Sequence, residues 1–256
     1  MSQYIKYFFR TVTDEYGTKA LSPLHIICLI IAISGIIFLI KQRKNIQENN
    51  KFANIIKIIL TTGLSMVVLS LYTWYIVTGF SGISESLPLY HCRTTMILCI
   101  LYTFKKIDVA KIVVIYWGIM GGILALLVPS TDPFIFPHLT FYTFFVGHIF
   151  MIWYVVLTLI TEKYKFNKKD LKTIILVTLV YNLILVVINH ILNGNYGFLT
   201  EAPVLTDSLK KLGRIEYILL ILSLYTIVLT LIYTISYKVQ QIGKTKKKSF
   251  VLGIFK

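Results

Sequence analysis

Charged residues are scarce in this sequence. Asp, Glu, Lys and Arg make up 14% of the 256 residues, whereas 56% are hydrophobic and the mean hydropathy is +0.75. A soluble domain carries about a quarter charged residues and does not need so many apolar runs. The composition therefore excludes an ordinary soluble domain and predicts an all-α membrane protein that crosses the bilayer several times.

Cysteine is also scarce, and the usual metal and catalytic motifs are missing. The three cysteines, Cys28, Cys92 and Cys99, all fall in apolar segments, and their odd number argues against a disulfide framework. The sequence contains no CxxC pair, no HExxH, no glycine-rich phosphate loop and no GxSxG. We therefore expect no metal and no cofactor, although the five histidines leave zinc open as an alternative.

Seven apolar segments predict seven transmembrane helices. A helix needs ~20 residues to cross ~30 Å of hydrocarbon, and most of the segments reach that length. Nearly all of the chain lies in or between them, so residues 1–256 predict a single transmembrane domain. The predicted spans are 22–40, 55–79, 87–104, 109–128, 136–160, 171–192 and 215–237, of which 87–104 is the shortest and most polar.

Lysine and arginine are concentrated in alternate loops. The basic segments are 41–54, 105–111, 161–172 and the tail 238–256. Segments 80–86 and 129–135 contain neither residue, so the positive-inside rule predicts the N-terminus outside and the C-terminus in the cytoplasm. The net charge of +15 thus reflects topology, and we expect no nucleic-acid partner. The Lys244–Lys248 cluster is expected to rest on anionic lipid.

The first 21 residues lack the continuous apolar core of a signal peptide. Within 1–21, Ile5, Phe8, Val12 and Tyr16 recur at helical spacing. This spacing predicts a short helix that lies in the membrane interface, with a flexible tail as the alternative.

The histidines gather in the predicted outer half of the membrane. His25, His91, His138 and His190 lie at or near outer span ends, and His148 lies ~15 Å further along its helix than His138. The predicted cytoplasmic halves contain no histidine. Because ionisable groups in hydrocarbon are costly and rarely serve packing alone, the pattern predicts a polar cavity that opens outward.

Several of these residues also have an ordinary interpretation. His25 and His190 suit interfacial anchors, and Cys28 and Cys99 suit packing, because buried cysteine behaves as a small hydrophobe. His148 differs, because a histidine at mid-membrane depth must find a hydrogen-bond partner. A functional role is therefore favoured for His148.

Short motifs between about residues 87 and 220 are similar to those of a known family. They are Leu87–Cys92, Trp117–Gly121, Ala125–Pro129, Phe136–His138, Phe144–His148 and Asn193–Leu199, with Pro203 downstream. Together they resemble the YwaF-like family of bacterial integral membrane proteins, which includes eukaryotic transmembrane protein 164. The resemblance implies seven spans and acyl transfer between phospholipids by a membrane-embedded cysteine.

Carried onto this sequence, the resemblance assigns the cysteine to Cys92 and the histidines to His138 and His148. Two positions depart from the family pattern. Tyr90 stands where the family often has histidine, and Arg93 stands where a small or acidic residue is usual. These departures bear on the substrate more than on the nucleophile.

Acyl transfer requires a nucleophile, a base and donors that stabilise an oxyanion. Cys92 is the expected nucleophile, His148 the expected base and His138 the alternative base. Arg93 is expected to bind a headgroup phosphate, although it could instead snorkel to the interface. The oxyanion donor is expected among Tyr90, Thr95, Asn189 and Asn195. His91 and Tyr196 complete the expected substrate-binding set.

These residues predict a multi-pass acyltransferase of the cell membrane. It would move a fatty acyl chain from a phospholipid, through a thioester on Cys92 at the outer leaflet, to a lysolipid or a lipoprotein. Water as acceptor would make it a lipid ester hydrolase. The other alternative is a non-catalytic permease, lipid-binding protein or partner subunit. A permease should carry polar residues through to the cytoplasmic side, where Thr103, Thr158 and Thr161 can be satisfied by their own helices.

Overall fold

The computed structural model describes residues 3–80, 82–203 and 206–254, with side chains up to Ile242. The described chain is helical and contains no strand, which confirms the predicted fold class. The elements are α1 (Gln3–Phe8), α2 (Pro23–Lys41), α3 (Arg43–Glu48), α4 (Asn50–Thr78), α5 (Gly82–Glu85), α6 (His91–Phe104), α7 (Asp108–Leu127), α8 (Leu139–Thr161), α9 (Lys168–Leu192), the 3-10 helix η1 (Tyr196–Phe198), α10 (Thr206–Leu209) and α11 (Arg214–Ile254).

Six helices in the described part of the chain are long and apolar enough to cross a membrane. They are α2, α4, α7, α8, α9 and the Arg214–Ile242 part of α11. The seventh predicted span, 87–104, forms α6, which has 14 residues and is only ~21 Å long. It is shorter than predicted because the chain turns at Pro88–Leu89 and enters the helix at His91. The chain is thus a multi-pass membrane protein, and the count of seven spans stays a prediction.

The helix ends follow the capping residues of the sequence. Ser22 and Asn49 accept backbone hydrogen bonds at the starts of α2 and α4, and Asn167 does so at the start of α9. Gly79 ends α4 in the left-handed conformation, which glycine adopts without a steric penalty. Local sequence therefore sets where these membrane helices begin and end.

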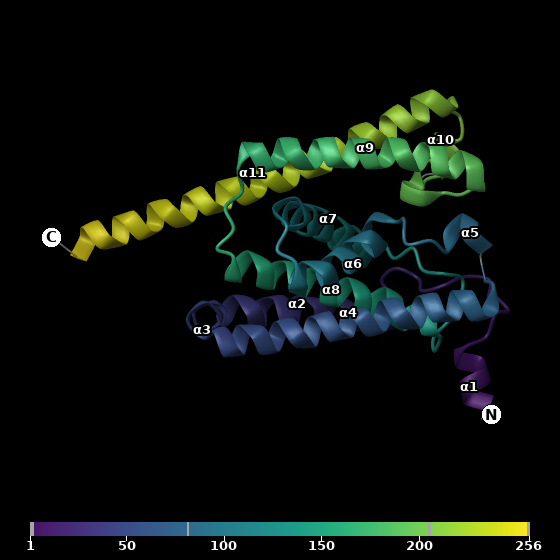
Figure 1. Ribbon diagram of the computed structural model, residues 1–256, viewed down its shortest axis with the longest axis horizontal. Helices are drawn as coiled ribbons and strands as arrows, with labels where there is room; N and C mark the ends of the chain where they lie inside the picture. The colour runs from purple at the N-terminus through teal and green to yellow at the C-terminus, as the bar shows by residue number, and fades with distance from the viewer. Residues whose placement is uncertain (1–2, 81, 204–205, 255–256) are drawn as a thin grey trace.

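The helices pack in layers, with α8 between α6 and α7 on one side and α2 and α4 on the other (Figure 1). The α8 helix contacts α2, α4, α6 and α7, and most of its length is buried. The α9 and α11 helices lie side by side and form the outermost layer. Most of the Arg214–Ile242 part of α11 is not covered by other helices of the protein, as expected for a helix that faces lipid.

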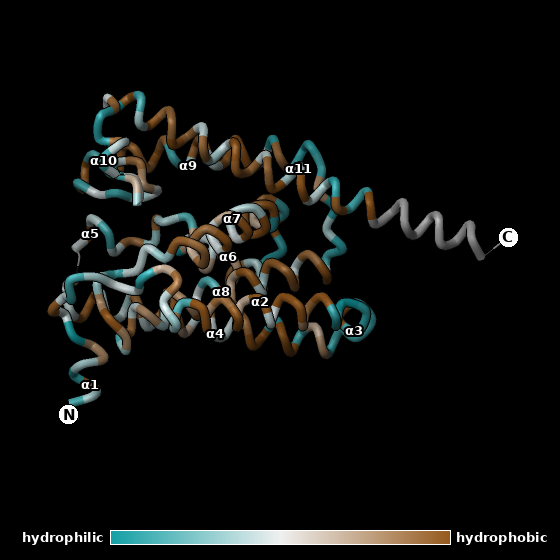
Figure 2. Tube along the Cα trace, turned by 180° about the vertical axis from the view of Figure 1, so that it is seen from behind, coloured by the Kyte–Doolittle hydropathy of each residue, from teal (hydrophilic) through white to brown (hydrophobic). Residues whose placement is uncertain are grey.

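The loops gather at the two ends of the bundle, as the charge pattern predicts (Figure 2). At one end, Lys106 pairs with Glu162 at 2.9 Å, and Gln47 donates to the Ile160 carbonyl at 3.1 Å. The α1, α5 and α10 helices lie at the other end (Figure 1). Which end faces the cytoplasm stays a prediction, and the side chains of Lys244–Lys248 lie outside the described residues.

The N-terminal segment is less helical than its apolar spacing predicts. Helix α1 ends at Phe8, so the helix does not reach Tyr16. Residues 9–18 instead lie against the loop between α7 and α8, where Arg10 donates to the Ile135 carbonyl at 2.8 Å. The segment differs from the predicted helix because its polar groups bond to this loop instead of forming a helical ladder.

Asp14 makes the attachment of this segment sensitive to pH. Its carboxylate accepts hydrogen bonds from the Ile135 N–H at 2.6 Å and from Arg10, and these hold the pKa of Asp14 below its ordinary value. A carboxyl group with a lowered folded-state pKa stabilises the fold above its unfolded value of about 3.9 and loses that effect as the pH falls through the folded-state pKa. We therefore expect residues 9–18 to exchange amide hydrogen faster at pH 3 than at pH 6, after correction for intrinsic rates. The variant Asp14→Asn should exchange fast at both values; a pH response that survives in it would contradict this role.

Candidate functional site

A cavity of about 640 Å³ lies between α4, α6, α7 and α8, beneath the loops at the end that holds α5 and α10. Its size is within the range of small-molecule sites. Six of the residues predicted from the sequence line it together: Tyr90, His91, Cys92, Arg93, His148 and Asn195. The other four, Thr95, His138, Asn189 and Tyr196, are not part of its lining, and the buried Thr95 hydroxyl donates to the His91 carbonyl at 2.6 Å.

Cys92 lies in the first turn of α6 and is half-buried. A Cβ added at the facing Gly121 would lie 3.6 Å from Cys92 Cβ, an ordinary contact distance, so α7 passes close beside Cys92. Tyr90 provides no side-chain cap, and Thr94 donates the first helical hydrogen bond, to the Tyr90 carbonyl at 2.9 Å. The backbone N–H groups of Cys92 and Arg93 therefore take no part in the helical ladder. They are candidate donors to an oxyanion.

His148 lies near the middle of α8 and is almost fully buried. Its Nδ1 lies 2.7 Å from the Phe144 carbonyl oxygen, which can only accept, so Nδ1 carries the proton. Nε2 is left with a lone pair, and no described residue bonds to it. This tautomer is the one that a general base requires.

The start of α6 packs closely against the middle of α8. Met96 lies one turn after Cys92 on the same face of α6. A Cβ added at Gly147, next to His148, would come within 2.8 Å of Met96 Cε. The two helices that carry the thiol and the imidazole therefore touch at the inner end of the cavity.

Arg93 is held at the cavity wall by the protein and does not extend freely to the interface. Its guanidinium donates to the Glu85 carbonyl and to the Tyr75 hydroxyl, both at 2.8 Å. The Tyr75 hydroxyl in turn donates to the Asp132 carboxylate at 3.3 Å. Burial raises the pKa of the Asp132 carboxyl, while the charge of Arg93 opposes this rise. The arrangement leaves a partly exposed cation that can exchange a carbonyl oxygen for a stronger anionic acceptor.

His91 is enclosed by aromatic rings. The rings of Tyr225, Trp117 and Tyr181 lie 4.6, 4.7 and 5.2 Å from its own, centroid to centroid. Nδ1 lies 3.2 Å from the Tyr225 hydroxyl, and no described residue bonds to Nε2. The cage ties the start of α6 to α7, α9 and α11, so His91 fixes the position of its neighbour Cys92.

Two other histidines are fully bonded structural residues. His138 Nδ1 accepts from the Thr140 N–H at 3.2 Å, and Nε2 donates to the Arg10 carbonyl at 2.9 Å. His138 thus caps α8, and no lone pair remains for the role of alternative base. His25, expected at the interface, is buried, and its Nε2 bonds to the Leu126 carbonyl at 2.8 Å. Both rings join segments distant in sequence.

The predicted asparagines organise the loop after α9. The Asn189 side chain bonds to both the N–H and the carbonyl of Tyr196, each at 2.8 Å. The Tyr196 hydroxyl donates to the Ile83 carbonyl at 2.6 Å and accepts from the Leu87 N–H at 2.9 Å. Asn195 Oδ1 accepts two backbone hydrogen bonds within its own loop. These groups shape the cavity and are already satisfied without a substrate.

Replacing Asn189 with alanine should loosen the loop 193–200. The change leaves both backbone groups of Tyr196 without a partner, which costs about 1–3 kcal/mol per buried group. We expect a lower melting temperature and faster amide exchange in this loop. The exposed neighbour His190 makes a suitable control, because His190→Ala removes no hydrogen bond described in this structure. Equal melting temperatures for the two variants would contradict the role of Asn189 in holding the loop 193–200.

The sequence reasoning missed three residues of the site. Asp132 and Tyr75 extend the Arg93 network, and Gly121 faces Cys92 across the α6–α7 contact. A signal existed for Asp132, which is the only charged residue of 129–135. Nothing in the sequence pairs Tyr75 with Arg93, because the two lie on different helices.

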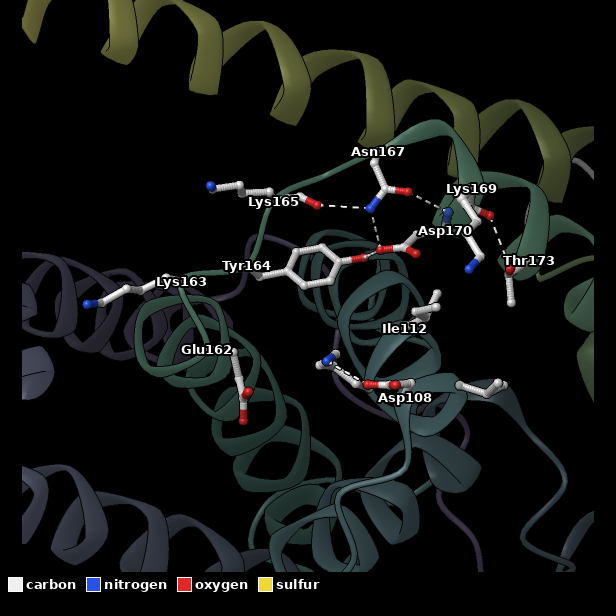
Figure 3. A pocket seen from close by; sticks show the side chains of 12 residues that line it. Asp108, Ile112, Glu162, Lys163, Tyr164, Lys165, Asn167, Lys169, Asp170 and Thr173 are labelled. Atoms are coloured by element: carbon white, nitrogen blue, oxygen red, sulfur yellow. Dashed lines mark hydrogen bonds and ion pairs between the residues drawn. The ribbon is translucent and has the colours of Figure 1, made fainter.

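A second cavity, of about 580 Å³, lies at the opposite end of the bundle (Figure 3). Its acidic side chains are already paired: Asp108 with Lys111 at 2.9 Å, and Asp170 with the Tyr164 hydroxyl at 2.6 Å. Lys163 and Lys165 lie at its exposed edge. The Tyr164–Asp170 contact holds the loop between α8 and α9. No group of three His, Cys, Asp or Glu residues in the described part of the chain could hold a metal ion.

The chain was compared with known protein families, curated proteins and solved structures. The model of the TMEM164 family matches residues 20–234, which is most of the chain and includes every residue of the cavity named above. No curated protein and no solved structure matches.

Proposed function

Because the chain belongs to the TMEM164 family, we propose that its cavity is the active site of a cysteine-dependent lipid acyltransferase. The family relation to transmembrane protein 164 that the motifs predicted is confirmed; the narrower YwaF-like assignment stays a prediction. One observation carries the proposal. The Cys92 thiol and a histidine nitrogen with a free lone pair, His148 Nε2, line the same cavity in a membrane protein.

In the first step, His148 Nε2 takes the proton from the Cys92 thiol. The thiolate attacks the carbonyl carbon of a phospholipid ester, so a C–S bond forms and the carbonyl oxygen becomes an oxyanion. The N–H groups of Cys92 and Arg93, which take no part in the helical ladder, are suited to stabilise this oxyanion. The ester C–O bond then breaks, and the lysolipid hydroxyl leaves with the proton from His148.

In the second step, an acceptor hydroxyl or amine takes the place of the leaving group. It loses a proton to His148 Nε2 and attacks the thioester, which forms the new acyl bond and returns the thiolate and then the thiol. A lysolipid or the amino group of a lipoprotein would serve as acceptor. With water in this position the same residues would catalyse hydrolysis of the lipid ester.

Arg93 provides the headgroup contact in this proposal. A lipid phosphate at the cavity would replace the Glu85 carbonyl as acceptor, because a charge-assisted hydrogen bond is roughly twice as strong as a neutral one. The guanidinium also lies over the Tyr90 ring, 5.0 Å from its centroid, which fixes its orientation. The ester carbonyl, next to the headgroup, would then lie near Cys92.

Packing beneath the cavity favours an enzyme over a permease. Cys99, Val114, Met151 and Tyr154 belong to one fully buried apolar cluster on the side of Cys92 away from the loops. A permease would need a polar path through this region. A lipid-binding protein without catalysis fits the packing equally well, and the reactivity of Cys92 separates it from the enzyme.

The thioester is the test of the proposal. Purified protein in vesicles that contain a phospholipid of defined acyl chains should gain the mass of one acyl group, located on the peptide with Cys92. Neutral hydroxylamine should release the group. Protein that stays at its unmodified mass after long incubation with several phospholipids, with and without added lysolipid, would overturn the acyltransferase and leave lipid binding.

A further inference from the structure

One face of α7 forms an apolar wall of the cavity that contains Cys92. Met120, Gly121, Leu124, Ala125 and Val128 line the cavity. Their spacing puts Met120, Gly121, Leu124 and Ala125 on a single helix face, and Val128 directly follows the end of α7. None of them carries a charge or a hydrogen-bonding side chain. Other residues of the lining, by contrast, include Arg93 and Asp132 from the polar network.

This wall also reaches the surface of the protein. Leu124 and Val128 line the cavity, and each keeps 50% of its surface exposed. The α7 helix is long and apolar enough to cross a membrane, so its exposed apolar side chains face lipid tails. The cavity therefore borders hydrocarbon along these α7 residues, Met120, Gly121, Leu124, Ala125 and Val128, which we call the α7 stripe. The exposed side chains of Glu85 and Glu201 mark its border with water.

The stripe ends at the thiol. Gly121 lies in the first turn of the stripe, and a Cβ added there would lie 3.6 Å from Cys92 Cβ. Leu124 and Ala125 follow one turn closer to the loop end of the helix. A hydrocarbon chain that enters sideways past the exposed Leu124, one turn from Gly121, would thus have its tail in the bilayer and its ester end beside Cys92.

We propose that the α7 stripe is a lateral portal through which the acyl chain of a bilayer lipid reaches Cys92, while the lipid headgroup enters at the polar border near Arg93. The inference rests on the proposed function for its purpose and adds the route and the class of substrate: a lipid that stays in the membrane while it reacts. An acyl chain is the occupant that fits, because the stripe is continuous with the hydrocarbon and offers no polar partner.

The test measures access to Cys92 and does not require acyl transfer. The protein is placed in vesicles of phosphatidylethanolamine and phosphatidylglycerol, and two thiol reagents are compared. A maleimide with a dodecyl chain dissolves in the bilayer, whereas 2-sulfonatoethyl methanethiosulfonate stays in water. Modification is measured on the peptide with Cys92, and the buried Cys28 and Cys99 are followed as internal references.

The variant Ala125→Trp fills the portal, and Ile123→Trp is its matched control. Ile123 lies on α7, is 47% exposed and does not line the cavity. We expect Ala125→Trp to slow modification of Cys92 by the alkyl maleimide about tenfold, equivalent to ~1.4 kcal/mol of added barrier. The sulfonate reagent should react with this variant within about twofold of the wild-type rate, and Ile123→Trp should leave both rates unchanged.

Three outcomes would overturn the portal. One is an unchanged rate of the alkyl maleimide in Ala125→Trp. The second is an equal slowing of both reagents, since it would place the obstruction at a shared entry or report a disturbed fold. The third is a wild-type Cys92 that reacts with the aqueous reagent alone. Failure of the proposed function would be seen separately, as the absence of a thioester in a protein whose Cys92 still reacts through the portal.

Discussion

Replacing Cys92 with serine should lower the rate of acyl transfer by at least about 10³-fold, because a serine hydroxyl is far less ionised and less nucleophilic than a thiol. The substitution is nearly isosteric, so the contact between Cys92 and Gly121 and the fold should persist. Transfer is measured as labelled acyl chains moved between lipids in vesicles. Monodispersity and melting temperature of the variant report the fold.

Cys28→Ala is the matched control for this prediction. Cys28 lies in a separate apolar cluster with Phe145 and Ile149 and does not line the cavity. It should keep the wild-type rate apart from a modest loss of stability. A Cys92→Ser protein that transfers acyl chains at the wild-type rate would remove the thioester from the mechanism.

Replacing His148 with alanine should lower the rate by about 10²–10⁴-fold, the usual contribution of a general base. The loss should appear in formation of the thioester, because Cys92 would keep its proton. The binding of phospholipid should change little, since the headgroup contact is assigned to Arg93. The measurement is the rate at which intact protein gains the acyl mass in a single turnover.

His190→Ala, on the exposed face of α9, provides the control for removal of an imidazole. His138→Ala offers a second comparison, because its ring bonds to Thr140 and Arg10 and not to the cavity. That variant should lose stability and keep its rate per folded molecule. If His138→Ala lost thioester formation and His148→Ala kept it, the assignment of the base would be reversed.

Loss of chemistry without loss of cellular function would point to the non-catalytic alternative. A partner subunit or lipid-binding protein should tolerate Cys92→Ser and His148→Ala in the cell, provided that both variants fold. The two substitutions thus test the reaction in vesicles and the physiological role in the cell with the same proteins.

The local sequence determines the helix bounds of this protein and the arrangement of its loops. Apolar runs and capping residues determined the helix bounds, as Ser22, Asn49 and Asn167 illustrate, because each cap bonds to residues in the first turn of its own helix. The alternation of basic loops predicted which loops gather at the same end, since neighbouring spans must run in opposite directions. The choice of Cys92 and His148 also came from sequence, through depth in the membrane and family motifs.

What only the tertiary structure decided concerns pairings between distant segments. The sequence separates His138 from His148 only by depth in the membrane, whereas the structure shows that the Arg10 carbonyl accepts a hydrogen bond from the His138 ring and that no described residue bonds to His148 Nε2. Likewise, Asn189 holds the loop after α9 and residues 9–18 are bound to the loop between α7 and α8, because each bonds to a segment that the sequence does not identify as its partner. Hydropathy and capping depend on neighbours along the chain, whereas the partner of a buried polar group depends on which helices pack together, and no local pattern encodes that.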